Sequence, residues 1–390
     1  MPNLISRLLR RPPEEKGSRA PASPFPAGTF VYLGGRAAWT ARDTASLARE
    51  GYGRNPVVHR AVRLVAEAAA SVPLDLSVGG QAVDTHPARV LLARPNQREA
   101  ATAFLETVYG HLTVSGNAYL EAVAVDGPPR ELYALRPDRM RVVPGPDGWP
   151  AAYDYSVDGK TVRFAQAPGE APAILHLALF NPLDDHYGLS PIEAAAVALD
   201  IHNAAGAWNK ALLDNAARPS GALILGGPAG SSLSDIAFDR LKAELEANYQ
   251  GAGNAGRPLL LEGGLDWKPL SLSPKDMDFV EAKNAAAREI ALAFGVPPLL
   301  LGLPGDNTHA NYAEANRAFY RQTVIPLAKR TGEAIAAWLS AFYGDELALV
   351  PDLDAIEALA LERESLWRRV GQAAFLNEDE KREAVGYGAR

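Results

Sequence analysis

The alternation of apolar and polar residues is clearest in residues 271–326, where it predicts two helices separated by a loop. Ser273 and Pro274 are residue types preferred at the cap and first position of a helix, and Asp276 complements its positive N-terminus. The apolar residues that follow recur at helical spacing and predict one packing face: Met277, Val280, Ala287, Ile290, Ala291 and Phe294. Gly295 suits the left-handed conformation that ends helices, and the prolines at 297 and 298 prevent the helix from continuing.

The loop after this helix, residues 299–308 (LLLGLPGDNT), joins an apolar run to a cluster of turn-forming residues. Leucines in so short a loop need a cover, and a neighbouring subunit could supply it. A second helix is predicted from about residue 309 or 311 to residue 343. Pro326 lies inside this helix and is expected to kink it or break it in two.

The N-terminal part of the chain changes from irregular composition to helices. Residues 1–11 place arginines around an apolar run too short for a secretory signal, and residues 12–29 have the Pro, Ser and Gly content of a poorly ordered tail. Asn55 and Pro56 predict the start of a helix that runs to about residue 70. Residues 72–83 predict a hairpin with a Gly-Gly turn, and residues 87–93 and 100–114 predict two further helices.

The period of the pattern changes to two after residue 116, which predicts an antiparallel sheet domain. Its expected strands are residues 117–125, 131–135, 140–143, 151–157, 161–165 and 174–180. Ser190 and Pro191 then predict the start of a long helix that ends near residue 216.

An α/β insert separates this long helix from the helix that begins at Pro274. Its expected order is strand 221–225, helix 233–249, strand 257–262 and strand 267–272. Two long helices on either side of a compact insert indicate a stalk with a head at its tip. After Gly344 the chain becomes acidic and helical, with a helix at residues 355–370 and a last short helix opened by a capping box of Asn377 and Glu380.

Composition excludes several classes of protein. The 390 residues contain no cysteine, which rules out disulfides, thiolate zinc sites and a cysteine nucleophile, and which suits an intracellular origin. No apolar run is long enough to span a bilayer, so no membrane partner is expected. The formal charge of -7 argues against tight binding of nucleic acid, because such binding comes from clustered Lys and Arg, but it is compatible with a loose, sliding contact.

The chemical motifs of common enzymes are missing or misplaced. The glycines of residues 251–256 match a dinucleotide-binding fingerprint, but they follow a predicted helix and precede a proline and a strand, which is the wrong context. No Walker sequence, nucleophile elbow or paired-histidine zinc motif occurs. We therefore predict no catalytic residues, no metal ligands and no cofactor.

Two polar clusters have both a functional and a structural interpretation. Asp184, Asp185 and His186 are close enough in sequence for a metal site, although a turn rich in side-chain to backbone bonds is several times more frequent. His176 lies in a predicted buried strand, where a histidine is more often a satisfied core residue than a ligand.

Several motifs resemble those of the portal proteins of tailed bacteriophages, in the branch shared by long-tailed phages and gene-transfer agents. The resemblance begins near residue 52 and covers nearly all of the chain that follows. It rests on residues 55–58 (NPVV), 116–119 (GNAY), 135–141 (LRPDRMR), 174–176 (ILH), 188–193 (GLSPIE), 289–302 with Asn311, Phe319 and Pro326, and 377–378 (NE).

This resemblance implies an α+β, portal-like fold of a ring-forming subunit. It assigns residues 1–29 to a flexible tail and residues 30–189 to a wing of helices and antiparallel sheet. Residues 190–217 and 274–295 would form the two stem helices, with a clip at residues 218–273 between them. Residues 296–311 would form the channel loop, residues 312–344 a long kinked wing helix, and residues 345–390 a small helical crown.

The resemblance also implies a function. The chain would be one subunit of a ring, usually dodecameric, that conducts double-stranded DNA into and out of a capsid at one vertex of the particle. Its expected partners are further copies of itself, non-specifically bound DNA, the terminase large subunit, the head–tail adaptor and the major capsid protein, with assembly in the bacterial cytoplasm. The implied channel-loop residues are Leu299, Leu300, Leu301, Gly302, Leu303, Pro304, Gly305, Asp306, Asn307, Thr308 and His309, and the implied partner-facing clip residues are Arg218, Pro219, Asn254, Arg257, Glu262 and Trp267.

Two other classes stay open at this point. A monomeric or small-oligomer structural adaptor would share the lack of catalytic motifs and would differ in its solution mass. An α/β enzyme would need Asp184, Asp185 and His186 to converge on a metal or to act as an acid/base pair, which metal analysis would detect.

Overall fold

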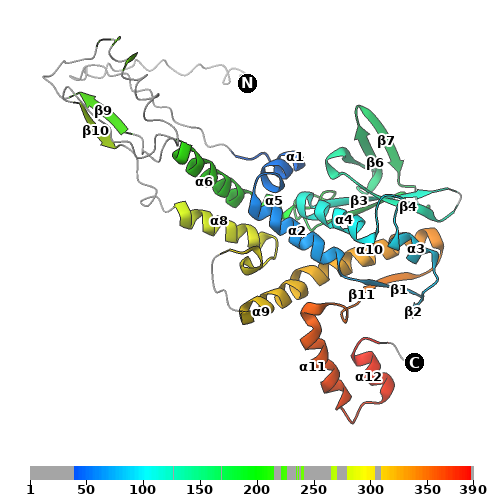
Figure 1. Ribbon diagram of the computed structural model, residues 1–390. Coiled ribbons are helices and arrows are strands. Elements are labelled where there is room, and N and C mark those ends of the chain that lie inside the picture. Colours follow the sequence, from blue (N-terminus) through cyan, green and yellow to red (C-terminus); the bar gives the residue numbers. More distant parts are fainter. Residues whose placement is uncertain are drawn as a thin grey trace, which may run out of the picture. The chain divides into compact units, whose positions relative to one another are not determined.

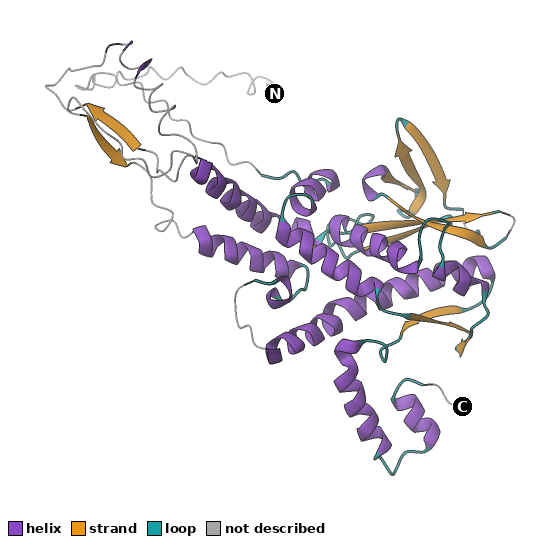
Figure 2. Cartoon of the chain, in the orientation of Figure 1, coloured by secondary structure: helices purple, strands orange, loops and turns teal. Residues whose placement is uncertain are grey.

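The computed structural model describes residues 39–387, except residues 126, 168, 215–220, 226–233, 235, 237–238, 241–264, 270–278 and 304–308. Contacts divide the chain into Met1–Trp39 and Thr40–Arg390, and the following account concerns the second unit. It mixes helices with small antiparallel sheets (Figures 1 and 2), which confirms the predicted α+β class.

Three helices form the centre of the core. Helix α2 (Pro56–Ala70) packs against α4 (Ala101–Ser115) and contacts α10 (Ile325–Tyr343). The predicted start of α2 is confirmed, because the Asn55 side chain accepts hydrogen bonds from the amides of Val57 and Val58. Short elements surround this centre: α1 (Thr44–Leu47), a π-helical turn (Ala48–Tyr52) and α3 (Pro87–Ala93).

The first sheet combines distant parts of the chain in the order β11-β1-β2. Strands β1 (Leu74–Val78) and β2 (Gln81–Ala82) form the predicted hairpin, with Gly79 and Gly80 both at positive φ. Strand β11 (Leu347–Pro351) pairs antiparallel with β1 and lies against α10. The prediction of helix after Gly344 is therefore wrong for this segment, whose alternating burial is that of a strand with one covered face.

The six predicted strands of the central region form two separate sheets rather than one. One sheet has the order β4-β3-β8 and contains β3 (Asn117–Ala124), β4 (Pro129–Leu135) and β8 (Ile174–Ala178). The other has the order β5-β6-β7 and contains β5 (Met140–Pro144), β6 (Pro150–Val157) and β7 (Lys160–Ala165). A 3-10 turn, Pro137–Arg139, separates β4 from β5 and redirects the chain to the second sheet.

The predicted long helix after Ser190 is interrupted. Helix α5 (Pro191–Ala194) ends at Ala195, whose ψ of 8° departs from helical geometry, and α6 (Ala196–Asp214) follows. Helix α6 packs side by side with α8 (Phe279–Ala293), as Figure 1 shows. Residues 215–217 and 274–278 of the two predicted stem helices lie outside the described residues. Of the predicted insert, the structure describes β9 (Gly221–Leu225) and β10 (Leu265–Pro269), which pair antiparallel.

The second helix of the central region stays helical past its proline. Helix α9 (His309–Phe319) continues through a π-helical turn (Tyr320–Val324) into α10. Pro326 has no amide hydrogen to donate, and the wider turn just before it accommodates this loss without ending the helix. The helix is therefore irregular where predicted, but it is not broken in two.

The C-terminal region after β11 is a helical hairpin of α11 (Ala360–Gly371) and α12 (Glu378–Ala384). A 3-10 turn, Glu357–Leu359, precedes it, and the predicted capping box of Asn377 and Glu380 is confirmed. Helix α11 contains no fully buried residue. Within the described part of the chain, none of the helices has the length and apolar character required to cross a membrane.

Candidate functional site

Hydrogen bonds to two neighbouring helices hold the first residues of the candidate channel loop, Gly295 and Val296, in place. Gly295 ends α8 with a φ of 62°, and the Thr323 hydroxyl of the π-helical turn donates a hydrogen bond of 2.6 Å to its carbonyl oxygen. A side chain at Gly295 would place its Cβ only 2.6 Å from the Thr323 hydroxyl. The amide of Val296 turns back to the Ala291 carbonyl at 2.9 Å. These contacts tie the base of the loop to the two helices beside it.

The leucines of the loop form a short 3-10 helix, Pro298–Leu301, that ends at Gly302 with a φ of 73°. All four leucines are half-buried, and Leu300 and Leu301 pack against the core of their own chain. The expectation that these leucines lack a cover within the subunit is therefore wrong for Leu300 and Leu301. Residues of α2, α8 and α9 lie against this turn. The contact with α2 could not be predicted from the pattern of the sequence, because α2 is far from the loop along the chain.

The other candidate residues are only partly described. Pro304, Gly305, Asp306, Asn307 and Thr308 lie outside the described residues, and His309 begins α9. Of the clip candidates, Arg218, Pro219, Asn254, Arg257 and Glu262 also lie outside them. Trp267 lies in β10 opposite Leu223 of β9. The assignment of these residues to a channel loop and a clip stays a prediction.

Helix α6 presents an apolar surface that nothing in the described chain covers. Its exposed residues follow each other at helical spacing, and we call them, with the last residue of α5, the stem surface: Ala194, Val197, Ile201, Ala204, Ala207 and Ala211. Val197 is 48% exposed and Ile201 is 43% exposed. Sequence reasoning missed this surface. The available signal was a helix with apolar residues on two sides, of which one chain can bury only one against α8.

A buried polar network joins α6 to the start of α2. The Asn55 amide nitrogen donates to Asn203 Oδ1 at 2.9 Å and lies 3.0 Å from His202 Nδ1. The Asn203 amide in turn donates to the Glu50 carbonyl at 3.0 Å. Burial lowers the pKa of His202, and Lys283 lowers it further. His202 is therefore neutral at physiological pH, so that Nδ1 accepts the Asn55 hydrogen bond.

The polar cluster at Asp184 is a turn. Asp184 Oδ1 accepts hydrogen bonds from the amides of His186 and Tyr187 at 2.8 and 2.9 Å. Among the described residues no group of three or more His, Cys, Asp or Glu side chains could hold a metal ion. The structural interpretation of Asp184, Asp185 and His186 therefore explains their proximity.

His176 is a half-buried, hydrogen-bonded residue beside the core, which favours the structural interpretation over that of a ligand. Its ring stacks on Tyr119 with 4.2 Å between the ring centroids, and Nε2 lies 3.0 Å from Asn117 Oδ1. Burial lowers the pKa of His176 to about 4. The ring is therefore neutral near pH 7 and joins two neighbouring strands, β3 and β8.

The described part of the chain has an α+β fold, in which the loop after α8 is anchored to neighbouring helices and α6 carries an exposed apolar surface. The family model described as "Phage portal protein" matches residues 56–386. The chain therefore belongs to the phage portal protein family.

Individual proteins and solved structures are similar to this chain over most of its length. A protein of Rickettsia bellii (strain RML369-C) is 42% identical over 340 residues, which cover 86% of this chain and 88% of that protein. Two solved structures are similar over 91% of this chain and 96% of theirs. One is titled "Neck of empty GTA particle computed with C6 symmetry", with 56% identity and a TM-score of 0.71. The other is titled "Neck of native GTA particle computed with C12 symmetry", with 55% identity and a TM-score of 0.69.

Proposed function

We propose that this chain is a subunit of a closed portal ring in the particle of a phage or a gene-transfer agent. The ring would hold the channel through which double-stranded DNA is packaged and later ejected. The observation that carries this proposal is the stem surface of α6. A row of exposed apolar side chains on a long helix needs a partner, and a ring of identical subunits covers it in every copy. The neck structure with C12 symmetry, 55% identical in sequence, supports a ring of twelve.

The channel loop is the part of the subunit that we assign to the DNA path. Its base is held by the Thr323 hydroxyl and by the packed leucines Leu300 and Leu301. Twelve loops held in this way would form a constriction of constant position around a duplex. The formal charge of -7 supports a channel that repels phosphates, so that DNA contacts stay weak and independent of sequence.

We assign the remaining surfaces by the organisation of the family. The clip, residues 218–273, would bind the terminase large subunit during packaging and the head–tail adaptor afterwards. The wing, residues 30–189, would contact the major capsid protein. The ring would assemble in the bacterial cytoplasm and remain at one vertex of the particle.

The ring proposal is tested by placing a charge on the stem surface. In Ile201→Glu a carboxylate would be buried without a partner in every subunit contact, which costs several kcal/mol per contact. We expect wild-type protein to form large rings by native mass measurement and electron microscopy, and Ile201→Glu to remain monomeric. The matched control is Val162→Glu, because Val162 is a similarly exposed apolar residue of β7 outside the stem. A monomeric wild-type protein at high micromolar concentration, without rings in assembled particles, contradicts the proposal.

A further inference from the structure

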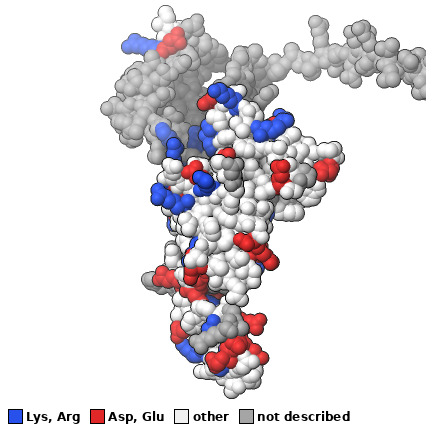
Figure 3. Space-filling view, turned by 90° about the vertical axis from the view of Figure 1, so that its right-hand side faces the viewer, with Lys and Arg blue, Asp and Glu red and all other residues white. Residues whose placement is uncertain are grey.

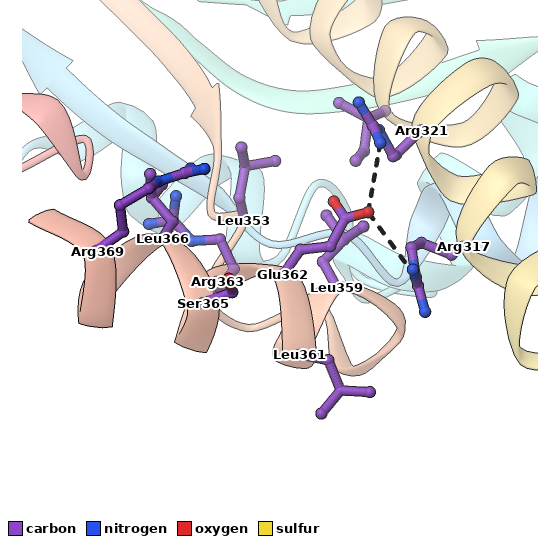
Figure 4. A pocket seen from close by; sticks show the side chains of 11 residues that line it. Arg317, Arg321, Leu353, Leu359, Leu361, Glu362, Arg363, Ser365, Leu366 and Arg369 are labelled. Atoms are coloured by element: carbon purple, nitrogen blue, oxygen red, sulfur yellow. Dashed lines mark hydrogen bonds and ion pairs between the residues drawn. The ribbon is translucent and has the colours of Figure 1, made fainter.

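A groove lies between α11 and the helix formed by α9 and the π-helical turn (Figure 4). Its volume of about 700 Å³ is within the range of sites that hold a bound group, roughly 300–1,000 Å³. Both apolar and basic side chains line it: Arg317, Arg321, Ile325, Leu353, Leu359, Leu361, Glu362, Arg363, Ser365, Leu366 and Arg369.

The charges in and beside the groove do not balance. Glu362 is shared by Arg317 and Arg321, at 3.8 and 3.3 Å, and the two dashed lines of Figure 4 mark these contacts. Arg317 also pairs with Glu314, and Arg363 pairs with Asp354. Over the described part of the chain Arg369 has no ion pair, and Arg321 is exposed at the edge of the groove. The groove therefore has an unpaired cation near one end and a partly satisfied one near the other.

The hairpin beside the groove carries apolar side chains that its own chain leaves uncovered. Helix α11 has no fully buried residue, and Phe375, in the turn between α11 and α12, is 86% exposed. Acidic residues begin three positions later, at Glu378. The Glu378 side chain is 89% exposed, and its carboxylate lies 3.4 Å from the ammonium group of Lys381. Figure 3 shows carboxylates gathering at the lower end of the molecule, where the hairpin lies. We call residues 373–378 the hairpin tip.

We propose that the hairpin tip of one subunit docks into the arginine-lined groove of the next subunit in the ring. Phe375 would occupy the apolar part formed by Ile325, Leu359 and Leu366, and Glu378 would pair with Arg369. This proposal rests on the proposed ring, and it adds a specific contact at the C-terminal end of the subunit.

The chemistry favours a second copy over the other occupants. Closed rings need two different, complementary surfaces on each subunit, and an acidic aromatic tip is complementary to a basic apolar groove. The groove lies between α11 and α9, and none of the residues that line it belongs to the hairpin tip of the same chain. Duplex DNA fits less well, since Glu362 lies inside the groove and its carboxylate would repel phosphates.

The absence of cysteine from the chain allows a cross-linking test without background. Ser365 lies in the groove and Ala374 in the tip, and both are exposed. Oxidation of the double variant Ser365→Cys with Ala374→Cys should join successive copies head to tail, which gives a ladder of covalent multimers on a denaturing gel. Each single variant should give dimers at most. The control pair, Thr161→Cys with Ala374→Cys, places one cysteine on exposed β7 and should give no ladder.

A charge exchange measures the same contact without a covalent bond. Arg369→Glu should raise the subunit concentration needed for half-assembly by about tenfold, a loss of about 1.4 kcal/mol per contact. Adding Glu378→Arg should restore assembly to within a few-fold of wild type. Thermal unfolding of both variants below the assembly concentration checks that the subunit is intact.

The two proposals fail in distinguishable ways. Rings seen by electron microscopy without a cross-linked ladder, or without rescue by the charge exchange, overturn the tip contact and leave the portal ring standing. Wild-type particles without rings overturn the proposed function. In that case the tip contact is judged separately, from the denaturing gel of the oxidised double-cysteine variant at high concentration. A ladder of multimers supports the contact, and monomer overturns it.

Discussion

One buried asparagine connects the start of α2 to α6, and its removal should lower the stability of the subunit. Asn55 is 1% exposed, and its side-chain oxygen caps α2 by accepting from the amides of Val57 and Val58 at 3.0 and 3.1 Å. In Asn55→Ala the loss of the cap costs about 0.5–2 kcal/mol. His202 and Asn203 also lose the donor that they share, and a buried unsatisfied group costs about 1–3 kcal/mol. We therefore expect the free energy of unfolding to fall by about 2–4 kcal/mol.

A second substitution at the same position separates the two contributions. Asn55→Asp keeps an oxygen that caps α2, but it removes the amide donor to His202 and Asn203. The new carboxylate should raise the pKa of His202 above its wild-type value, because it favours the charged ring. The folded variant then binds more protons than the folded wild type once the pH approaches this raised pKa. The deficit of Asn55→Asp relative to wild type should therefore shrink as pH falls through that pKa.

Urea unfolding of the full-length chain, at concentrations too low for assembly, measures both effects. Asn377→Ala is the matched control, because Asn377 caps α12 with an exposed side chain and belongs to no buried network. It should cost about 1 kcal/mol at most, the usual value of a cap alone. A loss below about 0.5 kcal/mol in Asn55→Ala would refute the reasoning. Equal losses in the Ala and Asp variants at every pH would show that the cap oxygen contributes nothing.

Three further predictions follow from the loop, a glycine contact and a buried histidine. Shortening residues 304–308 should leave folding and ring assembly intact but lower the DNA content of particles. Asp306→Ala should lower the DNA content less. Shortened-loop particles that fill with DNA and retain it normally would contradict a gating role of the loop. Gly188→Ala would place a Cβ 2.1 Å from a backbone carbonyl oxygen, and it should lower the free energy of unfolding in urea by more than about 2 kcal/mol. Gly110 lies inside α4, and no atom lies within 4 Å of the position of a Cβ there. Gly110→Ala should therefore raise the free energy of unfolding by up to about 1 kcal/mol. Because burial lowers the pKa of His176 to about 4, the unfolded chain binds more protons between that pH and about 6.5, so stability should fall as pH drops through this window. His176→Gln should flatten that dependence, and an unchanged pH profile would show that His176 does not contribute to it.

The parts of the fold that sequence predicted well are those whose causes lie within a few residues. The Asn55-Pro56 start of α2, the Gly79-Gly80 turn and the capping box at Asn377 each depend on local hydrogen bonds or on backbone conformation. The end of α8 at Gly295 belongs to the same group, because a positive φ there follows from the absence of a side chain.

The errors concern contacts between distant residues. Strand β11 was predicted as helix because its partner, β1, lies near the other end of the folded chain. The division of six strands into two sheets depends on a 3-10 turn at Pro137 that sends the chain away from β3 and β4. A period of two identifies strands, but it does not identify their neighbours.

The candidate site was predictable to a similar extent. The loop between α8 and α9 could be located from its prolines, glycines and leucines. Its anchor could not, because the Thr323 hydroxyl reaches Gly295 from a later helix. Likewise, one sequence shows that α6 carries apolar residues on two sides, but packing against α8 decides which side remains exposed.

Exposed apolar groups occur in every part of the described subunit, and they affect how it is stabilised. Within residues 40–189 Phe104 and Tyr119 are buried, whereas Trp149, Phe180 and Leu183 are exposed. In the stem and the C-terminal hairpin, Ile201, Leu292 and Phe375 remain exposed. In the proposed ring other copies would bury part of these groups, and binding that occurs only in the folded state stabilises in proportion to the logarithm of concentration. We therefore expect the subunit to become more resistant to unfolding as its concentration rises through the range in which it assembles.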